Sequence, residues 1–174
     1  MKKNCSLIIG STGFIGSSLL NIIDTEKEIF TISRSHLDGS NHFQIDISNL
    51  EVFKDTLFRL SDEYEKIDIY FLAGESSVDS SVSKPVSSFS ESVIPFLTLL
   101  ESMKNKSSTI VYSSTGAIYD SREETCFDEN SALYPPSPYA ASKHACEGIA
   151  MSYHETYDLD VRIARIFSVF GPEM

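Results

Sequence analysis

The sequence predicts an α/β domain built on a doubly wound parallel sheet, with helices covering both faces in three layers. Short apolar runs alternate with helix-length segments along almost the whole chain, and a glycine-rich turn joins the first run to the first helical segment. Such alternation is typical of βαβ units, whose parallel strands are buried between helices. A chain of 174 residues is long enough for one well-buried core, so we expect a single domain.

Six segments have the pattern of buried strands, one of them weakly. Each is a short apolar run between turn or helical segments. The five strong runs are CSLIIG (5–10), EIFTIS (28–33), IDIYFLA (67–73), STIVYSS (108–114) and DVRIARIF (160–167), and the weaker run is NHFQI (41–45).

The segments between these runs predict four helices. They lie near residues 14–24, 49–60, 85–104 and 138–157. The serine-rich stretch 75–92 has the composition of a disordered linker, but Pro85 and the apolar run after it favour a loop that leads into the third helix. Pro95 is expected to kink that helix or to delay its start, because proline cannot donate a helical hydrogen bond.

Charge and cysteine content restrict the class of partner. The chain carries 14 Lys and Arg against 25 Asp and Glu, a net charge of −11, which disfavours binding to nucleic acid or an anionic membrane and favours a small-molecule partner. The three cysteines, Cys5, Cys126 and Cys146, lie far apart and lack the spacing of zinc ligands, and their odd number and separation favour a reducing compartment. No apolar stretch has the length of a signal-peptide core or a membrane span, so we expect a cytoplasmic protein.

The turn IIGSTGFIG places three glycines in a GxxGxxG pattern between the first strand and the first helix. Glycine lacks the Cβ that would keep a pyrophosphate away from backbone N–H groups. The strand before and the helix after favour a dinucleotide site over a tight turn that is merely rich in glycine. The predicted cofactor contacts here are Gly10, Thr12, Gly13, Phe14, Ile15 and Gly16.

The end of the second strand bears on the choice between NAD and NADP. An acidic residue there binds the ribose 2′-hydroxyl of NAD, whereas an arginine accepts the 2′-phosphate of NADP. This strand ends in Ser33 and Arg34, which favours NADP. The alternative is that Arg34 is a solvated loop residue.

Tyr139 and Lys143, in YAASK, lie four residues apart and so share one face of the predicted fourth helix. A nearby lysine cation and a positively charged nicotinamide would lower the tyrosine pKa from its usual value of about 10. Tyr139 is therefore a candidate general acid and base, and Lys143 a candidate donor to the nicotinamide ribose. The same spacing also occurs by chance on amphipathic helices, but the glycine turn favours the catalytic interpretation.

A third catalytic group is expected where the fourth strong strand ends in Ser113, Ser114 and Thr115. Ligands of doubly wound sheets bind at the carboxyl ends of the strands. One of these three hydroxyls is predicted to hold the substrate oxygen.

Six blocks resemble, in the same order, the extended short-chain dehydrogenase/reductase family, and in particular its sugar-nucleotide epimerases and dehydratases. The blocks are GSTGFIG, LAGESSVDSSVSKP, VIPFLTLLES, YSSTGAIYD, PPSPYAASKHACE and RIFSVFGP. The resemblance implies that residues 1–174 form a Rossmann-like NAD(P)-binding domain and that the substrate-binding region lies outside this chain. It also implies a homodimer formed through helices 85–104 and 138–157, with Ile94, Leu97, Leu100 and Ile149 as contacts.

Further site residues follow from the resemblance by position. Asp46 and Ile47 would flank the adenine, and Thr115 would be the catalytic hydroxyl, with Ser113 and Ser114 in support. The middle of the cofactor would lie along Leu72, Ala73 and Gly74.

The chain also departs from the family's pattern. Ser92 stands where the family often has Asn, and Ser168 after Phe167 replaces the Asn of FN, which weakens the expectation of a standard nucleotide-diphosphate contact. Gly116 and Ala117 occupy the positions at which 4,6-dehydratases of the family carry an Asp-Glu pair. Dehydration is therefore disfavoured, and epimerisation or a simple oxidation or reduction of a sugar remains.

No metal site is expected. The four histidines are scattered, and the acidic run 120–130 lacks the alternating oxygen ligands of a calcium loop, so a solvated loop is favoured. The leading hypothesis is an NAD(P)-dependent sugar-nucleotide epimerase or reductase. The alternatives are a truncated or regulatory dinucleotide-binding module without turnover and a non-catalytic interaction scaffold.

Overall fold

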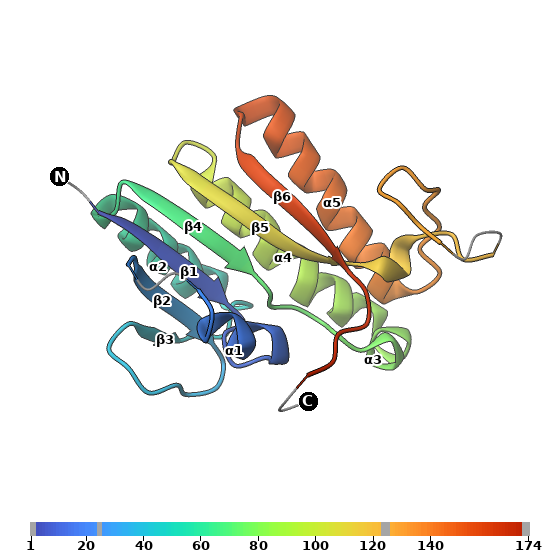
Figure 1. Ribbon diagram of the computed structural model, residues 1–174, viewed down its shortest axis with the longest axis horizontal. Coiled ribbons are helices and arrows are strands. Elements are labelled where there is room, and N and C mark those ends of the chain that lie inside the picture. The colour runs from blue at the N-terminus through green and yellow to red at the C-terminus, as the bar shows by residue number, and fades with distance from the viewer. Residues whose placement is uncertain (1–2, 24–25, 123–125, 172–174) are drawn as a thin grey trace.

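The computed structural model describes residues 3–23, 26–122 and 126–171. Residue 24, at the end of the predicted first helix, and residues 123–125 of the acidic run therefore lie outside the described residues, but the helix already ends at Leu20, earlier than expected. Six parallel strands form one sheet in the order β3-β2-β1-β4-β5-β6 (Figure 1). The strands are β1 (Asn4–Ile9), β2 (Glu28–Ser33), β3 (His42–Gln44), β4 (Lys66–Phe71), β5 (Ser108–Thr115) and β6 (Asp160–Ile166).

The helices are α1 (Phe14–Leu20), α2 (Leu50–Glu63), α3 (Val78–Ser83), α4 (Pro85–Met103) and α5 (Pro138–Tyr157). Figure 1 shows α1 on one face of the sheet and α2, α4 and α5 on the other. Right-handed crossovers explain this arrangement, because the connection from β1 to β2 runs in the opposite direction to those that lead to β4, β5 and β6. The predicted doubly wound, Rossmann-like α/β fold is thereby confirmed.

All six predicted strands are present, and β4 ends two residues earlier than expected. The chain turns after Phe71, and Gly74 has a φ of +129°, a backbone conformation that a strand does not contain. In α4, Pro95 lies inside a helix that begins at Pro85, so the start is not delayed. Because the first helical position needs no amide donor, Pro85 suits the start of α4.

The serine-rich stretch contains one helix that the sequence analysis missed. The stretch forms α3 between Ser77 and Lys84, and the Ser77 hydroxyl accepts a hydrogen bond from the Ser80 amide. The Glu75 carboxylate receives hydrogen bonds from the amides of Ser76 and Ser77 and from the Ser80 hydroxyl. Composition alone hides such local capping, because the same serines suit both a linker and a helix end.

The core lies between the sheet and the layer of α2, α4 and α5. Phe96 of α4 is fully buried, and its ring centroid lies 4.2 Å from that of Tyr112 and 5.2 Å from that of Phe71. Leu100, expected at a dimer interface, is also fully buried by its own chain. That expectation was wrong, since a residue with no exposed surface cannot contact a second copy.

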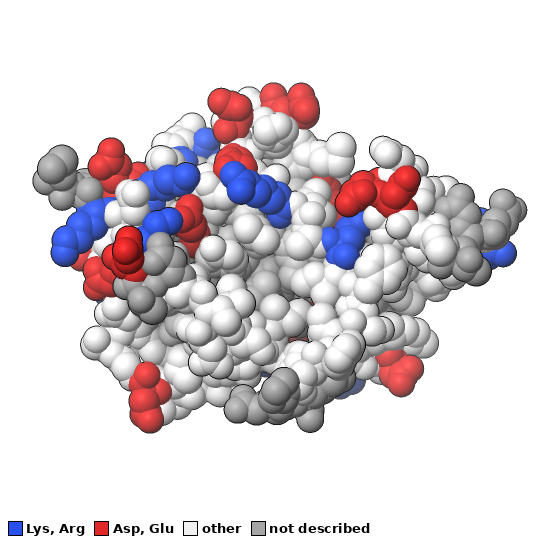
Figure 2. All heavy atoms as spheres, viewed as in Figure 1, with Lys and Arg blue, Asp and Glu red and all other residues white. Residues whose placement is uncertain are grey.

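No helix within residues 3–23, 26–122 and 126–171 has both the length and the apolar character needed to span a membrane. On the face seen in Figure 2, acidic and basic side chains are interspersed along the upper part. The region over α1 and the chain after β6 carries few charges.

We expect Phe96→Ala to lower the free energy of unfolding by about 3–5 kcal/mol, because it leaves a cavity beneath the sheet. Phe89→Ala is the matched control on α4, since Phe89 is 37% exposed. Its expected cost is about 1 kcal/mol or less. Urea denaturation followed by circular dichroism measures both, and equal losses would contradict the assigned core.

Candidate active site

Three groups of predicted site residues lie at the carboxyl ends of the neighbouring strands β1, β4 and β5. Gly10 follows β1, Leu72 follows β4, and Thr115 ends β5. From β1 the chain continues to β2 on one side, whereas β4 and the later strands add on the other side of β1. The strands β1 and β4 therefore flank the topological switch point of the sheet. This is the place at which doubly wound sheets bind their ligands.

The glycine turn is closely packed against the backbone. Gly10 has a φ of +92°, and a Cβ at this residue would lie 2.8 Å from the Ala73 amide nitrogen. A Cβ on Gly16 would lie only 2.2 Å from the Gly10 carbonyl oxygen. Both positions therefore require glycine, which explains the first and third residues of the GxxGxxG pattern. Thr12 and Gly13 are exposed at the tip of the turn, and Phe14 and Ile15, which begin α1, are half-buried.

The end of β2 places Ser33 and Arg34 differently. The Ser33 side chain is buried and its hydroxyl donates to the Ser35 carbonyl at 2.6 Å, whereas Arg34 is exposed. Hydrogen bonds from the Ser48 amide and hydroxyl lower the pKa of Asp46, and the positive charge of Arg34 lowers it further. The pKa of Glu75 is lowered in the same way, by hydrogen bonds from the Ser77 amide and the Ser80 hydroxyl and by the positive charge of Arg34.

Arg34 therefore lies in the field of two carboxylates. The sequence analysis singled out Asp46 but missed Glu75, whose position near Arg34 depends on the fold of the serine-rich stretch. Ile47, beside Asp46, packs against the core.

The segment Leu72–Gly74 runs between the glycine turn and α4. The Leu72 amide donates to the Ile9 carbonyl at 2.9 Å, which ties the segment to the end of β1. Ser92, at the position of the family's Asn, has its hydroxyl 3.4 Å from the Glu75 amide. Through this hydrogen bond from the Glu75 amide, Ser92 supports the loop after β4.

Lys143 is held in a buried position behind the strand ends. It is 5% exposed, its Nζ donates to the Ser113 carbonyl at 2.9 Å, and its Nζ lies 5.2 Å from the Tyr112 ring centroid. Burial lowers the pKa of Lys143 to about 8, so the ammonium form still predominates at pH 7. Tyr139, one turn earlier on α5, is half-buried and its amide donates to the Ser81 hydroxyl at 3.1 Å.

The three hydroxyls that end β5 have different partners. Ser113 donates to the Phe71 carbonyl at 3.0 Å, and Ser114 donates to the Glu147 carboxylate. The Thr115 oxygen accepts a hydrogen bond from the Ala117 amide at 3.2 Å and donates to none of the described residues. Of the three, Thr115 keeps its proton available, as its predicted role requires.

The sequence analysis missed an ion pair between the buried Glu147 and the partly buried Arg165. Glu147 is 2% exposed and accepts hydrogen bonds from Arg165 at 2.9–3.3 Å. Arg165 also donates to the Tyr119 hydroxyl at 3.0 Å. The hydrogen bonds to Glu147 raise the pKa of the Arg165 guanidinium. The sequence gives one clue to this ion pair: Glu147 follows Lys143 by four residues and therefore lies on the same face of the helix.

Within the described part of the chain, no cluster of three or more His, Cys, Asp or Glu side chains is arranged to hold a metal ion. Comparison with known proteins adds to this geometry. A family profile described as GDP-mannose 4,6 dehydratase matches residues 7–174.

The chain is 33% identical over 131 residues to a UDP-glucuronate 4-epimerase of Thermodesulfobacterium geofontis, covering 75% of this chain and 39% of that protein. Among solved structures, a UDP-N-acetylglucosamine 4-epimerase from Methanobrevibacter ruminantium M1 superposes with a TM-score of 0.83 at 27% identity, covering 99% of this chain and 57% of the other.

A dTDP-glucose 4,6-dehydratase from Streptomyces venezuelae, solved with NAD bound, gives a TM-score of 0.81 at 28% identity, covering 96% and 56% of the two chains. The chain thus spans about half the length of most proteins it matches. A profile match over nearly the whole chain, supported by these structures, shows that it belongs to the GDP-mannose 4,6-dehydratase family of extended short-chain dehydrogenases/reductases.

Proposed function

We propose that this chain is the cofactor-binding part of an NAD(P)-dependent enzyme that epimerises or oxidises a nucleotide-activated sugar. The observation that carries the proposal is that the glycine turn follows β1 and Thr115 ends β5, two strands away in the same parallel sheet, while Lys143 of α5 donates to the Ser113 carbonyl of β5. Relatives named as epimerases and dehydratases of UDP- and dTDP-sugars support the substrate class. Because those proteins are nearly twice as long, we assign turnover to a protein that also contains a substrate-binding region.

The residues present fit a dinucleotide. Gly13 is exposed in the glycine turn and has no side chain to cover its backbone, and Lys143 carries three N–H donors but donates to one protein acceptor, the Ser113 carbonyl, among the described residues. A bound nicotinamide dinucleotide supplies the hydride acceptor. Thr115 would hold the sugar hydroxyl, Tyr139 would take its proton, and the Lys143 ammonium would favour the ionised phenol and bind the ribose.

Two other proposals predict different behaviour. A regulatory module would bind a dinucleotide without turnover in any longer form, and an interaction scaffold would bind none. Mass spectrometry of the natively purified protein separates the scaffold from the other two, because only a cofactor-binding protein retains a dinucleotide.

In the full-length protein, Tyr139→Phe is expected to lower kcat by about 10²–10⁴-fold and to leave cofactor affinity nearly unchanged, since only the proton-transfer group is lost. Lys143→Met should lower both. Tyr157→Phe, at the far end of α5, is the matched control and should behave as wild type. Turnover assays with fluorescence titration of the cofactor measure these effects, and a fully active Tyr139→Phe variant would disprove the mechanism.

We further propose that NADP binds more tightly than NAD, through Arg34. A charge-assisted contact between Arg34 and a 2′-phosphate contributes about 1.5–3 kcal/mol. The carboxylates of Asp46 and Glu75 lie in the field of Arg34 and compete with the phosphate, so we expect the lower value. This corresponds to a roughly tenfold preference for NADP over NAD. Arg34→Ala should remove the preference. Arg162→Ala, at the start of β6 and paired with Asp160, is the control. Calorimetry with both cofactors measures it, and equal affinities in wild type would refute the proposal.

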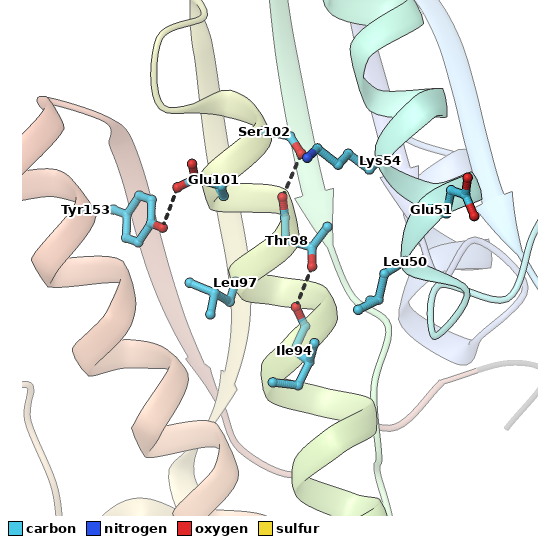
Figure 3. A pocket seen from close by; sticks show the side chains of 9 residues that line it. All are labelled: Leu50, Glu51, Lys54, Ile94, Leu97, Thr98, Glu101, Ser102 and Tyr153. Carbon is cyan, nitrogen blue, oxygen red and sulfur yellow. Dashed lines mark hydrogen bonds between the residues drawn. The ribbon is translucent and has the colours of Figure 1, made fainter.

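A homodimer through α4 and α5 is proposed from the family resemblance. A groove of about 560 Å³ lies on this face, and Figure 3 shows Leu50 from α2, Ile94 and Leu97 from α4 and Tyr153 from α5 around it. Ile94 is 43% exposed, while Ile149 packs partly against the core. The exposed apolar surface is thus centred on Ile94 and Leu97.

Ile94→Glu is expected to weaken self-association by at least tenfold, because it places a charge in an apolar contact. Ile22→Glu is the matched control, since Ile22 is 81% exposed and follows α1 on the opposite face of the sheet. Sedimentation velocity over a range of concentrations measures both. A wild-type chain that stays monomeric at high micromolar concentration would contradict the dimer.

A further inference from the structure

We propose that Phe167 is a specificity-determining residue, because its ring occupies the space that any side chain at residue 116 would need. It thereby keeps an acid out of the position directly after Thr115 and restricts the site to reversible oxidation without loss of water. This inference rests on the proposed function and adds to it the kind of reaction that the site excludes.

The contact between Gly116 and Phe167 is unusually close. A Cβ built on Gly116 would lie 2.6 Å from the Cδ1 and Cε1 atoms and 2.8 Å from the Cγ atom of the Phe167 ring. Contacts of this length do not occur between real atoms, so one of the two residues would have to move. Gly116 itself is buried and begins the short 3₁₀ turn that follows β5.

The Phe167 ring is held where it is from two sides. Its neighbour Ile166 pairs with Thr115 in the β5–β6 ladder, so the strand register brings Phe167 next to Gly116. On the other side the ring stacks on Tyr119 at a centroid distance of 6.0 Å and an interplanar angle of 13°.

Tyr119 is fixed in turn by its own contacts. It stacks on Phe127 at 5.1 Å, and Arg165 donates to its hydroxyl while paired with the buried Glu147. A side chain at 116 would therefore have to displace a ring that is supported by several contacts. Phe167 remains 57% exposed, which leaves part of its ring open to a substrate.

Proton transfer explains the consequence of this contact. Elimination of water from an oxidised sugar needs a base that removes a proton from carbon and an acid that protonates the departing hydroxyl. Residues 116 and 117, next to the hydroxyl of Thr115, are Gly and Ala and have no ionisable group. What remains is oxidation, in which a hydride goes from the carbinol carbon to the nicotinamide and the hydroxyl proton goes to Tyr139. Return of both restores a sugar of the same composition, and no C–O bond breaks.

A thermal-stability cycle on the 174-residue chain tests the steric part. Gly116→Ala is expected to lower Tm by about 3–10 °C, and the same change in a Phe167→Ala background by less than about 2 °C. Gly148→Ala is the matched control, because a Cβ there meets no atom within 4 Å. It should leave Tm unchanged or raise it. An equal loss in both backgrounds would overturn the proposal.

Product mass in the full-length protein tests the chemical part. With UDP-glucose, UDP-N-acetylglucosamine and dTDP-glucose as probes, we expect sugar products of unchanged mass or products that are lighter by two hydrogen atoms. A product lighter by one water molecule would overturn this inference and leave the proposed oxidation intact. A protein that oxidises none of the probes would overturn both.

Discussion

The close approach of the Gly10 turn to the chain after β4 is the constraint on which the rest of the structure depends. With the Ala73 amide in the place of a Cβ, the ends of β1 and β4 can come together only if residue 10 is glycine. The Leu72 amide closes the same junction by bonding to the Ile9 carbonyl. This junction sits at the switch point of the sheet, so its packing also decides where a ligand can meet backbone amides.

Two buried charges then fix α5 to the other half of the sheet. Lys143 donates a hydrogen bond to the Ser113 carbonyl of β5. Glu147, one turn later, accepts hydrogen bonds from Ser114 of β5 and Arg165 of β6. A buried ion pair contributes little net stability, but removal of one partner is costly, so it specifies one position of the helix. That position determines where Tyr139, on the first turn of α5, lies relative to the strand ends.

The sequence was sufficient for features that depend on local pattern. The apolar runs predicted the strands, which the structure contains, and the site region indicated by the GxxGxxG turn and the Tyr139–Lys143 spacing stays a prediction. Contacts between distant segments were not predictable in this way. Glu147 and Arg165 are 18 residues apart, and whether Leu100 faces the core or a partner depends on how α4 packs on the sheet. The serines of α3 suit both a linker and a helix end, so composition could not decide between them.

Relatives of this chain include both epimerases and dehydratases, and solved structures named for either reaction share its fold. A shared fold does not separate the two reactions. In this protein the position after Thr115 is filled from another strand end, because the β5–β6 register places the Phe167 ring on Gly116. On our proposal an acid at residue 116 would need a change at residue 167 as well, so the reaction type would depend on two residues from different strand ends, neither of which transfers a proton.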